Sequence, residues 1–219
     1  VTDSEARTLV NELLGSCLSP VVLLKDEKPA AVFGVGDSVR SDARETVRWF
    51  QEQGFRTGVL SGDHFSIVKA VGRELGFSDD AVRGDLSPEG KLDFIRSREG
   101  SGGTAMVGDG VNDAAALGAA SVGIGVHGGA EICLKTSDVF AASSGIEPVR
   151  RLFVGARRTM NVIYRNVAFS LIYNLVGATA AILGYVNPLV AAILMPLSSI
   201  TVISSSLLAH YFDKAQGWK

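Results

Sequence analysis

Charge is missing from one long part of the sequence: from Asn166 to Phe212 there is no Asp, Glu, Lys or Arg. This run far exceeds the roughly 20 apolar residues that an α-helix needs to cross a bilayer. The turn-forming stretch "GYVNP" (184–188) divides the run near its middle. The pattern predicts two transmembrane helices, residues 162–185 and 188–211, in contact with lipid. The alternative is a buried helical hairpin of a large soluble protein.

Basic residues flank this run on both sides, and the short loop inside it has none. Cytoplasmic segments next to membrane helices are enriched in Lys and Arg, so both chain ends are predicted to lie in the cytoplasm. A basic linker helix (149–161) precedes the spans and a tail (212–219) follows them. We therefore expect a multi-pass protein of the cell (inner) membrane with a cytoplasmic soluble domain. The basic residues are Arg150, Arg151, Arg157, Arg158, Arg165, Lys214 and Lys219.

Other scarcities exclude further classes of protein. The formal net charge of -2 lacks the basic excess of a nucleic-acid-binding protein. The only two cysteines, Cys17 and Cys133, form neither a CxxC pair nor a zinc pattern, which favours reduced thiols in the cytosol. The opening "VTDSEARTLV" has no secretory signal and reads as the middle of a longer sequence.

The first 150 residues alternate between strand-like and helix-like patterns. Apolar runs at 20–24 and 30–37 predict a hairpin. Beyond it, repeated strand and helix units indicate an α/β fold with a doubly wound parallel sheet. Ligands of such sheets bind beyond the carboxyl ends of the strands. The expected helices are 41–54, 64–76, 87–97 and 111–120, and the expected strands lie within 56–63, 81–87, 104–110, 121–126 and 137–142.

Polar clusters follow several of these strands: Asp37 with Arg40, "SGD" (61–63) and "GDGVND" (108–113). Asp109 and Asp113 are four residues apart at a strand-to-helix turn, where two carboxylates can share one hard cation. Mg²⁺ is the natural choice because it accepts one or two carboxylates together with phosphate and water. Gly108 allows the backbone to approach a ligand closely.

A phosphate site is predicted beside this cation site. The hydroxyl of Ser61 and the backbone amides of Gly62 and Asp63 form a potential phosphate cradle, and Lys91 adds a positive charge. Taken singly, these are an ordinary turn and a surface lysine. Taken in order, they indicate a phosphoryl-transfer site that lacks only a nucleophile.

The series "VLSGD", a lysine, "MVGDGVNDAAAL", a basic helix and two spans resembles the carboxyl-terminal part of P-type ATPases, members of the haloacid-dehalogenase-like superfamily. The resemblance implies that residues 1–30 end the nucleotide-binding domain, or are its return strands. It also implies that residues 31–148 are an incomplete phosphorylation domain, and that ATP and Mg²⁺ are the cofactors.

The resemblance also implies individual roles. Asp109 and Asp113 match the Mg²⁺-binding pair, and Ser61, Gly62 and Asp63 match the phosphate-contacting "TGD" element, with Ser keeping the hydroxyl of Thr. Lys91 matches the lysine that steadies the phosphoryl group, and Asn112 matches the supporting asparagine.

One large departure concerns the nucleophile. The family's phosphorylated aspartate lies in "DKTGT", and no such stretch occurs here; Asp213-Lys214 lacks the Thr-Gly-Thr. We therefore expect the chain to be inactive alone and to need the missing amino-terminal part of the pump. Two other hypotheses remain open: a membrane-anchored haloacid-dehalogenase-like phosphatase, and a truncated, non-catalytic partner or regulator of other membrane proteins.

The identity of the transported ion is predicted from polar and sulfur-containing residues in the two predicted spans. Two helices after this domain resemble the heavy-metal (CPx-type) branch, and its copper branch has Tyr-Asn and Met-x-x-Ser-Ser at matching places. A soft thioether selects Cu(I), or Ag(I), over hard cations. The resemblance also implies a copper chaperone as a partner. The alternative is that these side chains only pack the helices together. The predicted ligands are Tyr173, Asn174, Met195, Ser198 and Ser199.

Overall fold

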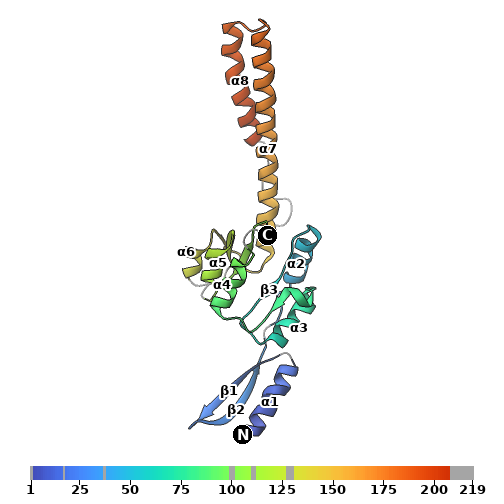
Figure 1. Ribbon diagram of the computed structural model, residues 1–219, viewed down its shortest axis with the longest axis vertical. Coiled ribbons are helices and arrows are strands. Elements are labelled where there is room, and N and C mark those ends of the chain that lie inside the picture. Colours follow the sequence, from blue (N-terminus) through green and yellow to red (C-terminus); the bar gives the residue numbers. More distant parts are fainter. Residues whose placement is uncertain are drawn as a thin grey trace. The chain divides into compact units, whose positions relative to one another are not determined.

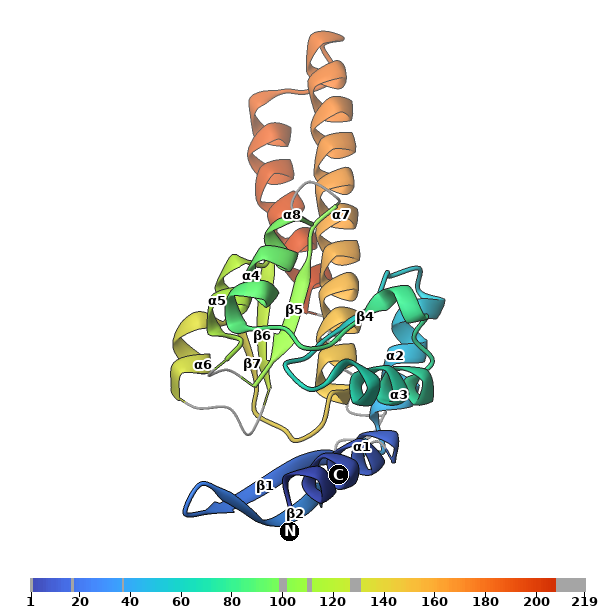
Figure 2. The same ribbon diagram turned by 60° about the horizontal axis from the view of Figure 1, so that its bottom comes forward.

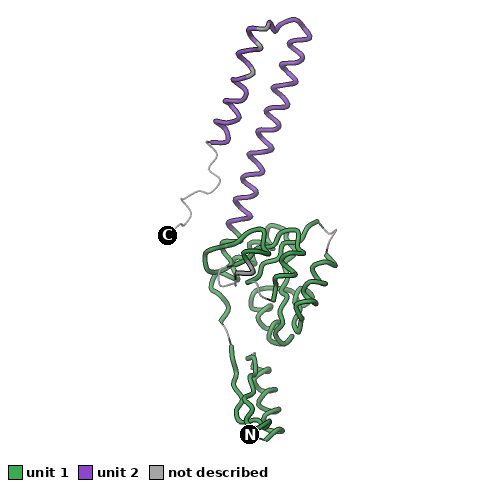
Figure 3. The backbone as a smooth tube through the Cα atoms, turned by 90° about the vertical axis from the view of Figure 1, so that its left-hand side faces the viewer, with its two compact units in different colours: residues 1–150 green, residues 151–219 purple. Residues whose placement is uncertain are grey.

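The computed structural model describes residues 2–16, 18–36, 38–98, 102–109, 112–126 and 131–207. The side chains of residues 131–133, 188, 191 and 195 lie outside that description. The chain divides into two compact units, Val1–Arg150 and Arg151–Lys219, which Figure 3 draws in different colours. Each unit is described by itself below.

The first unit begins with a helix that the sequence patterns did not predict. Helix α1 (Asp3–Gly15) starts at a capping box in which the Thr2 hydroxyl accepts from the Glu5 backbone and the Glu5 carboxylate accepts from the Thr2 backbone. Such reciprocal bonds satisfy free amides of the first helical turn. The predicted hairpin is confirmed: β1 (Ser19–Lys25) pairs antiparallel with β2 (Lys28–Val35).

Two βα units follow, and their core supports the first of two polar turns, "SGD" (61–63). They contain α2 (Ala43–Glu52), β3 (Val59–Leu60), α3 (Phe65–Leu75), a 3₁₀ turn (Asp79–Ala81) and β4 (Val82–Arg83). Strands β3 and β4 are parallel. A buried cluster of Val47, Val68, Phe77 and Val82 holds α2 and α3 against the strands.

The last part of the first unit contains the elements on either side of the second polar turn, "GDGVND" (108–113). Figures 1 and 2 show these helices and strands. It comprises α4 (Pro88–Arg96), β5 (Ala105–Gly108), α5 (Ala114–Ala119), β6 (Val122–Val126), α6 (Glu131–Thr136) and β7 (Val139–Ala141). Strands β5, β6 and β7 form a parallel sheet in that order. Ile95, Met106, Ala116 and Leu117 are buried together, so α4 and α5 pack on this sheet.

One aspect of the predicted sheet needs correction. The parallel strands form two separate ladders, β3–β4 and β5–β6–β7, and not one continuous sheet. Within the described ranges, β3 is hydrogen-bonded to β4 alone and β5 to β6 alone. The two ladders still belong to one core, because Leu60 of β3 packs against the cluster that contains Met106 of β5. Side-chain packing therefore joins strands that backbone hydrogen bonds do not.

The second unit is a helical hairpin, as predicted, but its first helix is longer. The basic linker and the first predicted span form one continuous helix, α7 (Glu147–Ile182), which begins in the first unit. Gly184, at φ 79°, lies in the turn before α8 (Pro188–Leu207), which contains Pro196.

The predicted membrane spans are not borne out by the helices described. In the ranges listed above, neither α7 nor any other helix combines the length and the mean hydropathy of a membrane-spanning segment. Helix α7 begins in the basic stretch, and the hydroxyl side chains of α8 all lie in its second half.

Several polar groups link α7 to α8. The Arg165 guanidinium donates to the Ser205 hydroxyl at 2.7 Å, and the Asn166 amide donates to the Ser206 hydroxyl at 2.8 Å. The Tyr173 hydroxyl donates to the Leu194 carbonyl at 2.6 Å. These bonds fix the register of the two helices in the hairpin.

Candidate phosphoryl-transfer site

The two polar turns follow the carboxyl ends of β3 and β5. "SGD" begins directly after Leu60, and Asp109 directly follows Gly108. Ser87 caps helix α4, because its hydroxyl accepts from the Gly90 backbone, and Pro88 is the first residue of the helix. A proline costs nothing there because the first amides of a helix have no partner within it. This start places Lys91 one turn into α4.

Lys91 and Asp113 form the central contact of the site. The Lys91 ammonium lies 2.8 Å from Asp113 Oδ1, and the two side chains are only 11% and 13% exposed. Lysine is rarely buried unless it is paired. The pair joins α4 to the residue that precedes α5, so it fixes the position of a positive charge beside the carboxyl end of β5.

The geometry around Gly108 tests whether Mg²⁺ fits here. A side chain at position 108 would put its Cβ 2.7 Å from Asp113 Oδ2, so only glycine leaves room for that carboxylate. Oδ2 therefore lies against Gly108, the last residue of β5, and Asp109, directly after that strand, is exposed. The Asp113 carboxylate beside the end of β5, with Asp109 next in the chain after that strand, offers the kind of oxygen donors that Mg²⁺ takes when phosphate and water complete its shell. Among the described residues, no group of three or more His, Cys, Asp or Glu side chains is placed to hold a metal ion.

The predicted phosphate turn, formed by Ser61, Gly62 and Asp63, is closed by hydrogen bonds between Ser61 and Asp63. The Ser61 hydroxyl donates to Asp63 Oδ2 at 2.8 Å and accepts from the Asp63 backbone at 3.2 Å. Gly62 has the Leu86 carbonyl 3.2 Å from the position of a Cβ, so the turn lies against the residues just before α4. Ser61 is half-buried, and Gly62 and Asp63 are exposed. The structure thus brings the turn next to the helix that carries Lys91.

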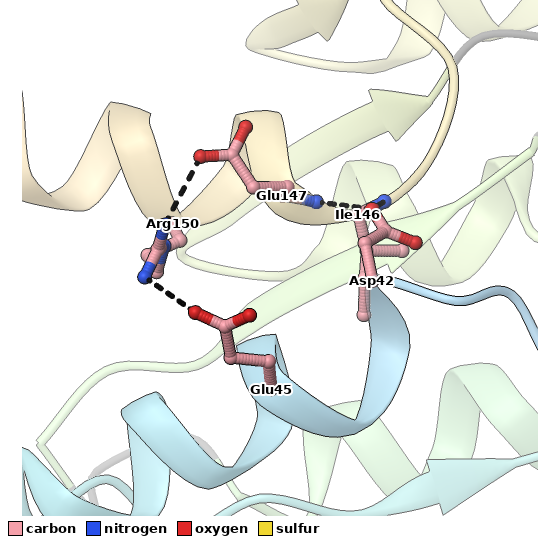
Figure 4. Close-up of polar contacts among 5 residues, drawn as sticks. All are labelled: Asp42, Glu45, Ile146, Glu147 and Arg150. Atoms are coloured by element: carbon pink, nitrogen blue, oxygen red, sulfur yellow. Dashed lines mark hydrogen bonds and ion pairs between the residues drawn. The ribbon is translucent and has the colours of Figure 1, made fainter. Parts of the chain in front are cut away.

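A second polar cluster, missed in the sequence, joins α2 to the start of α7. Figure 4 shows the Asp42 carboxylate accepting from the backbone of Ile146 at 2.7 Å and of Glu147 at 2.8 Å. Arg150 contacts Glu45 at 3.4 Å and Glu147 at 3.3 Å. Asp42 directly precedes α2 but makes no cap bond to it, and caps α7 instead. No local pattern reveals a contact across 104 residues.

The remaining predicted residues have different outcomes. Asn112 is an exposed turn residue directly before Asp113. Asp37 lies outside the described residues, and Arg40 lines an open cavity of about 540 Å³ together with Asp42 and Gly145. In the hairpin, Tyr173 and Ser198 are half-buried, whereas Asn174 and Ser199 are exposed. The side chain of Met195 lies outside the described residues.

Parallel strands with a lysine and carboxylates near their carboxyl ends are the arrangement predicted for a phosphoryl-transfer domain. Residues 5–121 match the model of the haloacid dehalogenase-like hydrolases, and the chain belongs to that family.

Within this family, the chain is similar in sequence to copper-transporting P-type ATPases. The chain is 31% identical over 186 residues to the probable copper-importing P-type ATPase A of Enterococcus hirae, which covers 84% of this chain and 26% of that protein. It is 34% identical over 190 residues to a copper-exporting P-type ATPase of Mycobacterium tuberculosis, covering 86% and 25%. The chain thus spans about a quarter of these relatives.

A solved structure supports the fold. A crystal structure of a zinc-transporting PIB-type ATPase in the E2.Pi state superposes with a TM-score of 0.79 at 24% identity, covering 94% of this chain and 34% of that one. At this identity the likeness concerns the fold alone.

Proposed function

We propose that the chain is the carboxyl-terminal part of an ATP-driven heavy-metal pump that moves Cu(I), or Ag(I), across a membrane. One observation carries the proposal: the nearly buried pair of Lys91 and Asp113 at the carboxyl end of β5. A surface salt bridge needs no such burial, and a charge pair kept away from water at a strand end is typical of a catalytic centre. The copper-importing and copper-exporting relatives support the choice of cation but leave the direction open.

The residues of the site divide the work of phosphoryl transfer. Lys91 and the Ser61 turn would hold the phosphoryl oxygens. The Gly62 amide would donate to them, and the Ser61 hydroxyl and the Asp63 amide would do so on giving up their bonds to each other's residue. Asp109 and Asp113 would hold Mg²⁺, with Asn112 beside them. When bound, the ion supplies positive charge that stabilises the transferring phosphoryl group.

The phosphorylated aspartate is proposed to come from a segment outside these 219 residues. Its position is suggested by the two ladders, since β3 and β5 pair on only one side within the described ranges and share a packed core. A further parallel strand that paired with both would end between "SGD" and Asp109. An aspartate at that strand end would face the phosphate donors and the carboxylates together.

The cation pathway is proposed to run along the hairpin. Its support is the uncharged run from Asn166 to Phe212, flanked by arginines, which we take as two spans of the assembled pump. Tyr173 contacts the carbonyl of Leu194, the residue directly before Met195. This contact puts the "YN" pair of α7 beside the "MPLSS" stretch of α8. The two stretches together would supply the proposed ligands: Tyr173 and Asn174 from α7, and Met195, Ser198 and Ser199 from α8.

Replacing Met195 with alanine tests the cation assignment. In the protein translated from the complete reading frame, Met195→Ala should weaken Cu(I) binding by about tenfold or more, because a soft ligand is lost. The matched control is Met160→Ala, at an exposed methionine of α7. Competition with a Cu(I) chelator measures the affinity. If both variants lost the same Cu(I) affinity, or neither lost any, Met195 would be a packing residue and not a Cu(I) ligand.

The pump itself is tested by ATP hydrolysis in the same protein. Cu(I) should stimulate hydrolysis more than Zn²⁺ does at equal free concentration, since the predicted ligand set contains a thioether and no carboxylate. Hydrolysis that no metal cation stimulates would contradict the pump and favour the phosphatase.

A further inference from the structure

Asp85, which none of the sequence patterns singled out, has an unusual backbone. Its φ is 54°, in the left-handed region that few residues other than glycine adopt, although Asp and Asn tolerate it best. Such conformations cost free energy and persist only when surrounding contacts hold them, often close to functional sites. The neighbouring Gly84 is equally constrained, because a Cβ there would lie 2.5 Å from Phe65 Cα.

Asp85 contacts Asp63, the last residue of the phosphate turn, and Phe65, two residues after that turn. Asp85 Oδ2 accepts from the backbone of Phe65, the first residue of α3, at 3.1 Å. The Asp85 backbone donates to the Asp63 carbonyl at 2.8 Å. On either side, Ser61 donates to the Arg83 carbonyl at 3.0 Å, and Leu86 donates to the Ser61 carbonyl at 3.1 Å. Residues 83–86 therefore hold both ends of the turn, at Ser61 and at Asp63, by hydrogen bonds.

The same four residues lead directly into α4. Ser87 caps that helix, and Lys91 lies one turn later, paired with Asp113. Of the four hydrogen bonds just described for residues 83–86, only the one from the Phe65 backbone to Asp85 Oδ2 involves a side chain; the other three join backbone to backbone. Loss of the Asp85 side chain would remove one of the bonds at the start of α3, where the His64 side chain also accepts from the Ser66 backbone, without touching Lys91, Asp109 or Asp113.

We propose that Asp85 is a positioning residue, which fixes the phosphate turn of Ser61, Gly62 and Asp63 at the distance from Lys91 that phosphoryl transfer requires. The inference rests on the proposed function and adds to it a residue that does not itself touch the phosphoryl group. It explains why an acceptor side chain occupies a backbone conformation that favours glycine.

Three substitutions separate the side chain from the backbone. Asp85→Gly keeps the left-handed conformation but removes the acceptor, and Asp85→Asn keeps both. Asp85→Ala removes the acceptor and adds backbone strain. The readouts, in the protein translated from the complete reading frame, are inhibition of its ATPase by inorganic orthovanadate, a mimic of the transferring phosphoryl group, and the Mg²⁺ concentration that gives half-maximal rate.

We expect Asp85→Gly to raise the half-inhibitory vanadate concentration by about three- to tenfold, the value of one hydrogen bond, with the Mg²⁺ requirement unchanged. Asp85→Asn should stay within about twofold of the wild type, and Asp85→Ala should match Asp85→Gly in vanadate sensitivity but melt at a lower temperature. A purely structural role would lower the melting temperature and the yield of active protein but leave vanadate sensitivity as it is.

The outcomes distinguish this inference from the function on which it rests. Wild-type vanadate sensitivity in Asp85→Gly, or an equal loss in Asp85→Asn, would overturn the positioning role alone. A wild-type protein without ATP hydrolysis would overturn both.

Discussion

Replacing Asp113 with asparagine is expected to slow phosphoryl transfer by about 10²-fold or more at ordinary Mg²⁺ concentrations. The carboxylate is a proposed Mg²⁺ ligand and also neutralises the nearly buried Lys91 ammonium 2.8 Å away. Asparagine keeps the size and one oxygen but removes the negative charge, so both interactions weaken. The measurement is the rate of phosphorylation from ATP as Mg²⁺ is varied, in the protein translated from the complete reading frame.

Two controls separate catalysis from folding. Asp93→Asn, at an exposed carboxylate on α4, should leave the rate unchanged. Asp113→Leu alone should destabilise the chain by about 3 kcal/mol because it strands the lysine, whereas Lys91→Met combined with Asp113→Leu should recover most of that loss. Activity should not return in the double variant. An Asp113→Asn protein with the wild-type rate and Mg²⁺ dependence would remove Asp113 from the metal site.

Replacing Gly145 with alanine is expected to destabilise the first unit by about 3–5 kcal/mol. Gly145 has φ 90°, and its added Cβ would clash with Asp42 Oδ2. A left-handed conformation costs a non-glycine residue about 1–2 kcal/mol, and displacing the carboxylate weakens two hydrogen bonds to a charged acceptor. The free energy of unfolding and the exchange rates of the Ile146 and Glu147 amides measure the effect.

The comparison variants are Gly118→Ala and Asp42→Ala. Gly118 lies within α5 with nothing within 4 Å of a Cβ, so alanine there should stabilise the chain by up to about 1 kcal/mol. Because Gly145→Ala acts partly through Asp42, combining it with Asp42→Ala should cost less than the sum of the two single changes. Additive losses would show that the backbone strain acts independently of the Asp42 contact.

The sequence predicted the elements around the site because their signals are local. The alternation of apolar runs with capped, periodic segments located β3, α3, α4 and β5, and glycines and carboxylates marked the strand ends. Helix α1 was missed although Thr2 and Glu5 have the spacing of a capping box.

Other features could not be found locally. The bond from Asp42 to α7 spans 104 residues, and the burial of Lys91 depends on how α4 meets α5. The positive φ of Asp85 follows from contacts with residues 61–65 and has no composition signal beyond the adjacent Gly84. The gap between the two parallel ladders is equally invisible, because the pattern of strands along the chain does not say which of them pair.

Formation of an acid-stable phosphoenzyme from ATP labelled at its γ-phosphate tests the central claim most directly. The account predicts that the protein translated from the complete reading frame becomes labelled only with Mg²⁺ present, on an aspartate outside these 219 residues, and that the 219-residue chain alone does not. Label on the isolated chain, or label that forms equally well without Mg²⁺ or with Asp113→Asn, would contradict it.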